Sequence, residues 1–284
     1  MIYSLEHLKP IDYLLVGHLT LDLVEGGVRL GGSVAYAGLT AQALGMRVGI
    51  ISSFGDDLSL DPLGSIPVVH LPALASTTFS NHETPKGRVQ RIFHCAETLE
   101  YYLVPEIWRR PLIVHLAPVA QEVSPDFVRH FAHSFIGVTP QGWLRAWDAE
   151  GNVYPTEWPE STFVLPHVDA TVISVEDVAG SEDMINEFAA SCHILAVTEG
   201  AGGSRVFWNG EVRCFRPPPN ILEVDPVGAG DIYAAAFFIR LYETRDPWEA
   251  GRFATQLASF SVTRAGLESI PTQREIEQCL VEVC

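Results

Sequence analysis

The stretch DPVGAGD at positions 225–231 could bind an anion and carry out acid–base chemistry at one place. Glycines and a small alanine allow consecutive backbone N–H groups to converge on one point. The apolar run that follows, IYAAAFFIRLYE, predicts a helix whose N-terminus adds positive potential. Asp231, at the helix start, would be held ionised by this field and could accept the proton of a hydroxyl that attacks phosphorus. The alternative is an ordinary loop and a capped helix.

A second glycine-rich stretch, VTEGAGG at 197–203, follows the apolar run HILAV. Turns at the carboxyl ends of parallel strands often hold nucleotides, and Thr198 could donate to a phosphate. The alternative is a plain turn between two strands of a hairpin. The sequence contains no GxxxxGK[ST] motif, and Tyr233 stands where GxGxxG would need its third glycine. These absences disfavour a dehydrogenase that binds NAD.

Strand-like and helical segments alternate along the chain and must position these loops. Apolar runs such as 13–16 and 48–51 alternate with helical patterns such as 34–44 and SPDFVRHFAHSF. This alternation predicts a mainly parallel sheet with helices on both faces. The segments 19–30 and 77–99 instead alternate around glycine-containing turns and predict antiparallel ribbons. We therefore expect one α/β domain over residues 1–284 with a small β-strand lid.

Composition narrows the function classes. The chain has 284 residues, of which 47% are hydrophobic and 19% charged, so it can bury a sizeable core. Its formal net charge of −17 disfavours nucleic acid and anionic membranes as partners. Five scattered cysteines without a CxxC pair disfavour disulfides or zinc and predict a reducing, cytoplasmic location. The N-terminal segment lacks the features of a signal peptide, and no apolar run reaches membrane-spanning length.

The glycine-rich stretches carry a resemblance to a known family. DPVGAGD resembles the DTxGAGD signature of the PfkB, or ribokinase-like, carbohydrate kinases, and VTEGAGG is similar to their TxGxxG nucleotide segment. LGGSVAYAGLTAQALG resembles their N-terminal GG region, and FGDD and GRVQRIF follow in the same order. The resemblance spans nearly the whole chain. It implies a three-layer fold with a mostly parallel central sheet, helices on both sides and a lid at about 19–30 and 77–99. It also implies transfer of the ATP γ-phosphoryl group to an alcohol with Mg²⁺.

The resemblance also implies roles for single residues. The catalytic group would be Asp231 as base with the amides of Gly228, Ala229 and Gly230 as an anion hole. The nucleotide would lie against Thr198, Gly200, Gly203 and Ser174. The acceptor would contact Asp22, Gly32 and Ser33. Asp177, or Glu176 in a shifted register, would replace the glutamate of the Mg²⁺-organising NxxE segment. Asp225, Gly266 and Ser269 would lie at a loop that binds a monovalent cation such as K⁺.

The role of Arg88 in the lid and the identity of the acceptor each have more than one explanation. Arg88 could contact the acceptor or its phosphates, or it could be a solvated edge-strand residue. Tyr36 stands where the family usually has the asparagine of GGxxxN, which disfavours ribokinase activity, and GGSVAYAG resembles inositol-kinase-type members. The acceptor is therefore predicted to be a sugar, a polyol or cyclitol such as inositol, or a nucleoside.

A protein of another class would keep the fold as a catalytically weak ligand-binding sensor. The altered segment SVED at 174–177 motivates this alternative, whereas the intact Asp231 argues against it. Small-molecule alcohol and ATP are the predicted partners of the kinase, and an exposed lid edge would allow a homodimer through the lid.

Overall fold

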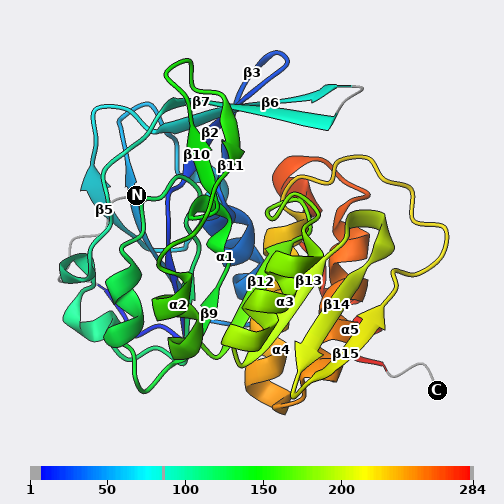
Figure 1. The fold of residues 1–284 in the computed structure, drawn as a ribbon. Coiled ribbons are helices and arrows are strands. Elements are labelled where there is room, and N and C mark those ends of the chain that lie inside the picture. The colour runs from blue at the N-terminus through cyan, green and yellow to red at the C-terminus, as the bar shows by residue number, and fades with distance from the viewer. Residues whose placement is uncertain (1–7, 85–86, 282–284) are drawn as a thin grey trace.

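A large sheet forms the centre of the computed structural model, which describes residues 8–84 and 87–281 (Figure 1). Its nine strands are β1 (Tyr13–Val16), β4 (Val48–Phe54), β5 (Val68–Pro72), β8 (Ile113–Leu116), β9 (Phe135–Val138), β12 (Ala170–Ser174), β13 (Ile194–Thr198), β14 (Ser204–Trp208) and β15 (Glu211–Phe215). They lie in the order β15-β14-β13-β12-β9-β8-β1-β4-β5. Neighbours from β13 to β5 are parallel, and only β14 and β15 add antiparallel pairs. The predicted mainly parallel sheet is confirmed.

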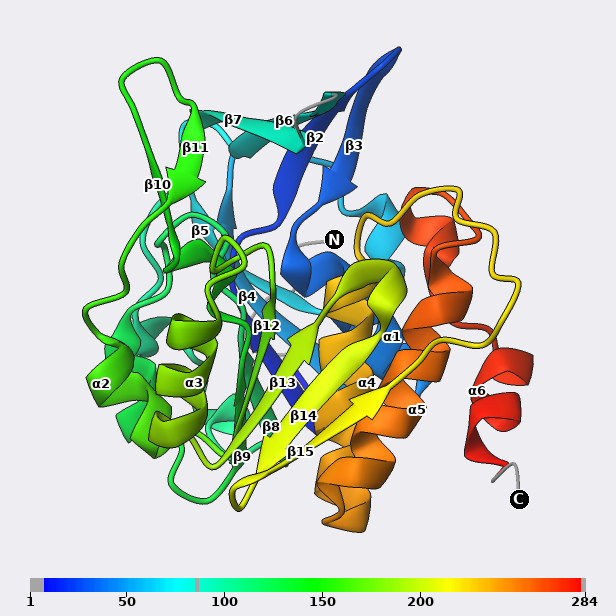
Figure 2. The same cartoon turned by 45° about the vertical axis from the view of Figure 1, so that its right-hand side comes forward.

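Helices cover both faces of this sheet, as Figure 2 shows. One face carries α1 (Ser33–Ala43), α4 (Ala229–Thr244), α5 (Pro247–Ser261) and α6 (Gln273–Leu280), and the other carries α2 (Ser161–Val164) and α3 (Glu182–Ser191). In β1, Tyr13 and Leu15 pack into the core with α1 and α4, whereas Leu14 and Val16 pack into the second core. Side chains of a strand point alternately to opposite faces, so a fully apolar strand needs cover on both.

The apolar run after DPVGAGD forms α4, a deeply packed helix. Residues 232–239 are all buried, between the sheet, α1 and α5. A helix that is apolar on all sides is stable only in such an interior position. Within residues 8–84 and 87–281, no helix is both long and apolar enough to cross a bilayer.

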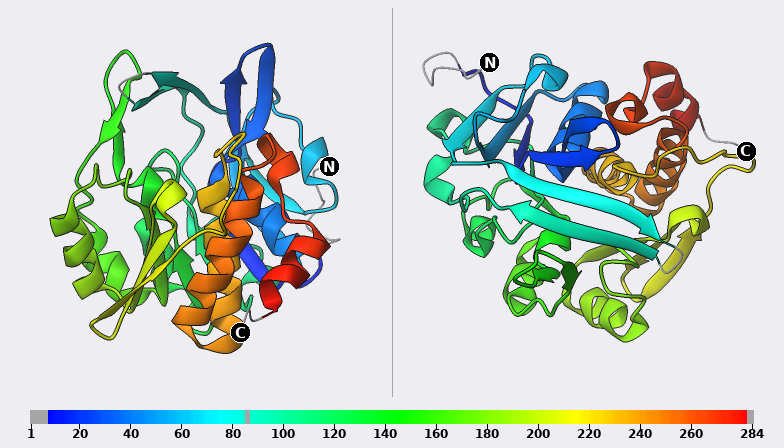
Figure 3. Two further views of the ribbon diagram at one scale, coloured as in Figure 1. Left: turned by 90° about the vertical axis from the view of Figure 1, so that its right-hand side faces the viewer. Right: turned by 90° about the horizontal axis from the view of Figure 1, so that it is seen from above.

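A separate four-stranded sheet lies above the carboxyl ends of the central strands (Figure 3). It contains β2 (Thr20–Val24), β3 (Gly27–Gly31), β6 (Thr77–Thr84) and β7 (Gly87–His94) in the order β3-β2-β6-β7. The pairs β2–β3 and β6–β7 are antiparallel, as expected for 19–30 and 77–99, and a parallel pairing of β2 with β6 joins them. The two ribbons therefore form one layer, called the lid below.

A buried histidine fixes the base of the lid. His18, which is fully buried, shares a hydrogen bond of 2.7 Å between Nδ1 and Thr77 Oγ1, and its Nε2 bonds to the carbonyl of Glu97. The carboxylate of Glu122 accepts the backbone N–H of His18. These bonds connect the start of β2 and β6 to the central sheet, so the lid has a defined position above it.

One helical expectation was wrong. The segment SPDFVRHFAHSF forms only the short 3₁₀ helix η5 (Pro125–Arg129). Phe127 and Phe131 are buried and stack on each other, with ring centroids 6.4 Å apart. Two phenylalanines four residues apart can make this contact across a tight turn. The apolar pattern therefore did not require a longer helix. A two-stranded hairpin, β10 (Arg145–Trp147) and β11 (Val153–Pro155), completes the structure.

Candidate functional site

The predicted site residues gather at the edge of the sheet that faces the lid. Strands β12 and β13 end at this edge with Ser174 and Thr198, and β1 leads from it into β2, which carries Asp22. Helices α1 and α4 begin here, directly after Gly32 and Gly228. Loops at the carboxyl ends of parallel strands lie together and are the usual ligand site in open α/β sheets.

The N-terminus of α4 is open. Gly228 precedes it with φ +83°, and no side chain in the described part of the chain caps the helix. A Cβ on Gly228 would overlap the ring of Tyr36, so this position requires glycine for conformation and for space. Asp231 lies in the first turn and is not the N-cap. The capped-helix alternative therefore does not describe this helix, whose first amides and positive end remain available to an anion.

Asp231 lies in a charge environment that makes it a weak base near neutrality. The pKa of its carboxyl is raised to about 6. Burial is the largest cause and the charges of Asp177 and Asp22 act in the same direction, whereas a hydrogen bond from Ser33 and the charge of Arg145 lower the pKa. The positive end of α4 alone predicted an ionised group with an ordinary or lowered pKa. Burial outweighs that field, but the carboxyl is still mostly ionised at neutral pH.

The residues predicted to contact the acceptor lie near Asp231, on the lid and at the start of α1. Asp22 is 7% exposed, accepts a hydrogen bond of 3.1 Å from Thr20 Oγ1, and lies so close to Gly31 that a Cβ there would overlap its carboxylate. Ser33 is buried and hydrogen-bonds to Asp231. Gly32 has φ +91°, and a Cβ there would overlap the carbonyl oxygen of His18. The chain thus requires glycine where α1 begins beside the lid.

Tyr36 is a residue of this cluster to which the sequence analysis assigned no role. It is 1% exposed, and its hydroxyl has no hydrogen-bond partner among the described residues. Burial raises the pKa of this hydroxyl, the nearby charge of Arg29 lowers it, and three carboxylates, those of Asp22, Asp231 and Asp225, raise it again. The departure from the family asparagine was the available signal. The structure adds that the Tyr36 ring packs directly against Gly228.

Of the two carboxylates considered for Mg²⁺, the structure brings Asp177 toward Asp231. Asp177 Oδ2 accepts the backbone N–H of Ser174 at 2.8 Å, and Gln141 Nε2 lies 3.4 Å from its Oδ1. Its charge raises the pKa of Asp231, whereas the side chain of Glu176 is exposed. Across the described ranges, no group of three or more histidine, cysteine or acidic residues could hold a metal alone. Mg²⁺ commonly needs only one or two carboxylates when phosphates supply the remaining ligands.

The glycine-rich stretch after β13 forms a hairpin turn, as the plain alternative predicted. A 3₁₀ turn, η8 (Gly200–Gly202), joins β13 to β14, and Thr198 Oγ1 donates to the carbonyl of Ile173 at 3.4 Å. Gly203 has φ +95°, and a Cβ there would overlap the carbonyl oxygen of Phe215. These contacts explain the glycine without a ligand. The turn nevertheless lies at the same sheet edge as α4. Arg88 lies in β7, and its side chain is outside the described residues.

The residues considered for a monovalent cation are held by other contacts. Asp225 Oδ1 accepts the N–H of Val227 at 3.0 Å, and Oδ2 accepts the N–H of Gly266 at 3.0 Å. Arg29 Nη1 lies 3.2 Å from the same Oδ2. Burial tends to raise the pKa of Asp225, but these donors outweigh it and hold the pKa below its usual value. Ser269 is buried and its hydroxyl has no partner among the described residues. These contacts do not fit a cation bound to Asp225.

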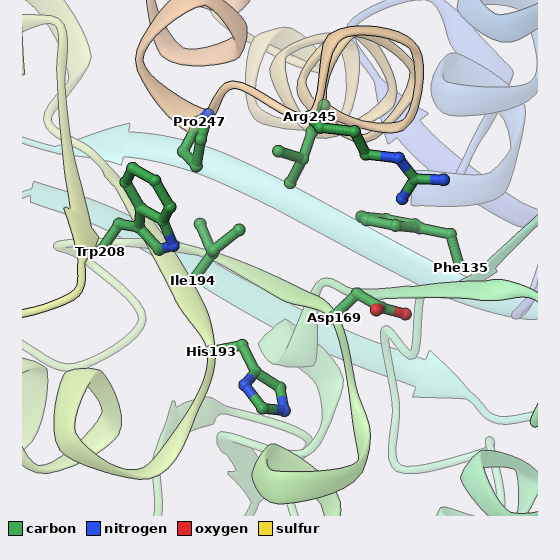
Figure 4. Close-up of a pocket in the computed structure, with 8 residues that line it drawn as sticks. Phe135, Asp169, His193, Ile194, Trp208, Arg245 and Pro247 are labelled. Carbon is green, nitrogen blue, oxygen red and sulfur yellow. The ribbon is translucent and has the colours of Figure 1, made fainter.

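Two cavities lie away from this cluster. One of about 170 Å³, shown in Figure 4, is lined by Phe135 and Ile194, which begin their strands, and by Arg245, which follows α4. It therefore lies at the opposite edge of the sheet. The other, of about 480 Å³, lies between β7 and the β10–β11 hairpin. None of the predicted site residues lines either cavity.

Comparison with known proteins agrees with the predicted fold. Residues 165–273, which contain both glycine-rich stretches, match the pfkB family carbohydrate kinase model. The chain is 26% identical over 289 aligned positions to an inositol 3-kinase of Oryza sativa subsp. japonica, covering 92% of this chain and 70% of that protein.

Solved structures extend the likeness to the whole fold. A pyrophosphate-dependent kinase in the ribokinase family, complexed with a pyrophosphate analog and myo-inositol, has a TM-score of 0.76 at 20% identity and covers 94% of this chain and 100% of its own. Arabidopsis thaliana ribokinase complexed with ribose and ATP has a TM-score of 0.73 at 19% identity, with 96% and 99% covered. The chain therefore contains a region similar to the pfkB family carbohydrate kinases, and its whole fold is that of the ribokinase-like proteins.

Proposed function

We propose that the protein is an ATP-dependent kinase that phosphorylates a hydroxyl group of a small molecule. One observation carries the proposal: Asp231, with a pKa raised to about 6, lies in the first turn of an uncapped helix and hydrogen-bonds to Ser33 on the acceptor side. A base and an anion-binding helix end are thus adjacent. Phosphoryl transfer needs positioning and charge stabilisation of this kind.

In the proposed reaction the acceptor lies between the lid and the sheet edge. Asp22 and Ser33 hold its hydroxyl groups, and Asp231 accepts the proton of the attacking one. The new O–P bond forms as the bond from the γ-phosphorus to the bridging oxygen breaks, and ADP leaves. The amides of Gly228, Ala229 and Gly230 stabilise the charge on the transferring group. The lid excludes water, which would otherwise compete with the alcohol.

The nucleotide would lie along the β13–β14 turn, against Thr198, Gly200 and Gly203, with Ser174 on the neighbouring strand. Asp177 is the residue that would hold Mg²⁺, directly or through water, because its carboxylate lies in the charge environment of Asp231. When bound with the nucleotide, Mg²⁺ supplies positive charge to the phosphates. The proposal does not include a monovalent cation, because Asp225 already has other partners.

We propose a cyclitol or related polyol as the acceptor class, ahead of other sugars and nucleosides. The likeness to an inositol 3-kinase and to a kinase complexed with myo-inositol supports this class. Tyr36 supports it as well, since a tyrosine cannot make the paired amide contacts of an asparagine. No observation favours the sensor alternative.

An acceptor screen tests this function. The protein is assayed for ADP release with Mg-ATP, and for phosphate release with Mg-pyrophosphate, across cyclitols, sugars and nucleosides. We expect ATP with a cyclitol such as myo-inositol to give the highest turnover. Binding of ATP without acceptor-dependent turnover would favour a sensor. A preference for pyrophosphate would overturn the assignment of ATP as the phosphoryl donor, but it would leave the kinase function in place.

The raised pKa of Asp231 predicts the pH dependence of the reaction. A base works only when deprotonated, so kcat/KM should fall below a midpoint near pH 6. Ser33→Ala removes a hydrogen bond that lowers this pKa, so the midpoint should move to higher pH. Rate profiles of both proteins measure the shift. Ser259→Ala, which removes a buried hydroxyl bonded to the Thr255 carbonyl in α5, should leave it in place. A midpoint near pH 4 in wild type would contradict the role of Asp231.

Two further features concern the location of the protein in the cell and its assembly with a second copy. We propose a cytoplasmic location because Cys95, Cys192, Cys214 and Cys279 are free thiols. We also propose that the lid, whose outer strand β3 is a sheet edge, can pair with a second copy. Sedimentation of the full chain measures directly whether the protein is a monomer or a dimer.

A further inference from the structure

We propose that Arg29 acts as a built-in cation at the loop before α4, so that catalysis does not depend on a monovalent metal ion. The inference rests on the proposed phosphoryl transfer for its activity readout, but not for its stability readout. Arg29 lies in lid strand β3 and Asp225 lies 196 positions later, at the start of the anion-binding stretch. Their contact joins two parts of the site that no local sequence pattern connects.

The Asp225 carboxylate has three donors, two backbone N–H groups and one guanidinium N–H. Its Oδ1 accepts a hydrogen bond from the N–H of Val227. Its Oδ2 accepts one from the N–H of Gly266 and lies 3.2 Å from Arg29 Nη1. The side chain of Asp225 is only 16% exposed and that of Arg29 30%, so solvent screens this pair less than a surface pair. Two backbone segments and the lid therefore converge on one carboxylate.

A metal cation has no favourable place in this arrangement. Gly266 presents its N–H to Asp225, and N–H groups repel cations. A Cβ on Gly266 would lie 3.3 Å from Arg29 Nη1, which shows how closely the guanidinium covers this loop. A second positive charge at Asp225 would face the guanidinium at short range in a partly buried site. The arginine neutralises the carboxylate and excludes a metal ion by the same contact.

The contact also links the lid to the anion-binding amides. In the β2–β3 register, Arg29 is the cross-strand partner of Asp22, so both side chains project from the same face of the lid. Asp225 in turn fixes Val227, the residue before Gly228. Arg29 thus connects the strand that holds the acceptor to the turn that presents the phosphate-binding N–H groups. It is a positioning residue, because it acts through Asp225.

The first test replaces K⁺ by Na⁺ or tetramethylammonium at constant ionic strength. We expect kcat and the melting temperature of the ligand-free wild-type protein to be the same in all three salts. Arg29→Ala should lower kcat by about ten- to a hundredfold, because loosening the loop misplaces the amides that hold the phosphoryl group. It should also lower the melting temperature. A gain of tenfold or more in wild-type kcat with K⁺ would overturn the proposal.

The second test is chemical rescue. Millimolar guanidinium can occupy the space that Arg29→Ala leaves beside Asp225, so it should raise both the kcat and the ligand-free melting temperature of this variant. Arg47→Ala is the matched control, since Arg47 also pairs with an aspartate, Asp12, but on an exposed surface. It should keep wild-type kcat and show no rescue. Arg29→Ala with wild-type kcat and melting temperature would overturn the proposal.

The two readouts separate this inference from the proposed function. A wild-type protein without kinase activity would still show whether the melting temperature of Arg29→Ala responds to guanidinium. Rescue of the melting temperature in that case supports the built-in cation and rejects only the kinase function. Loss of stability that guanidinium does not reverse rejects the built-in cation.

Discussion

Asp231→Asn is expected to lower kcat by about two to four orders of magnitude, because the amide keeps the shape of the side chain but cannot accept the proton of the acceptor hydroxyl. The other contacts of the site remain, so the affinity for ATP should change little. Steady-state kinetics with the best acceptor and calorimetric titration with ATP measure the two quantities separately.

The stability of the same variant provides an internal check. The carboxyl of Asp231 has a pKa raised by burial to about 6 in the folded protein, so its ionised form is less favourable there than in the unfolded chain. This cost is absent at low pH, when the group is protonated in both states. It appears as the pH rises from the usual pKa of an aspartate, which applies to the unfolded chain, to the pKa of about 6 in the folded protein. Asp231→Asn should therefore melt at the same temperature as wild type or higher at neutral pH.

An exposed aspartate in the first turn of another helix gives the control. Asp183 lies in the first turn of α3, as Asp231 lies in the first turn of α4, but its side chain is exposed. Asp183→Asn should keep wild-type kcat. A kcat within tenfold of wild type for Asp231→Asn would remove Asp231 from the mechanism.

Gly228→Ala should reduce stability and activity together. An alanine at φ +83° is strained, and its Cβ would overlap the Tyr36 ring, so helix and ring must separate. Strain of this kind costs about 1–3 kcal/mol, and overpacking costs about as much again. We expect the free energy of unfolding to fall by about 2–6 kcal/mol and kcat by at least about a hundredfold, because the amide directions change.

A second glycine with positive φ separates strain from overlap. Gly210, in the β14–β15 turn, has φ +77°, and no described atom lies within 4 Å of the position that a Cβ would take there. Gly210→Ala should therefore cost only the strain of about 1–3 kcal/mol, without the added cost of overlap, and leave kcat unchanged. Denaturant unfolding measures both variants. Equal losses of stability for the two would mean that Tyr36 does not press on Gly228.

Local sequence patterns predicted the central sheet, the two ribbons and helix α4, because each of these follows from an apolar run or an apolar alternation within one segment. The same reasoning failed at SPDFVRHFAHSF, where two stacked phenylalanines are satisfied by a short turn. Periodicity of apolar residues reports burial, and it does not fix helix length when the contacts are few.

Contacts between distant segments could not be predicted from the sequence. The parallel pairing of β2 with β6, the approach of Arg29 to Asp225 and the packing of Tyr36 on Gly228 all depend on how the lid meets α1 and α4. The pKa of Asp231 is a further case, because the helix field could be inferred from the motif but the burial that outweighs it could not. The sequence was enough to propose candidate site residues, but it did not give the electrostatics around them.

The central claim is that the γ-phosphoryl group passes to an alcohol and not to water. Phosphorus NMR of a reaction with Mg-ATP and the preferred acceptor measures this directly, since a phosphate monoester and inorganic phosphate give separate signals. The proposed mechanism predicts a monoester that grows as ATP is consumed, little inorganic phosphate, and neither product with Asp231→Asn. Consumption of ATP that yields only inorganic phosphate, or no consumption with any acceptor although ATP binds, would contradict it.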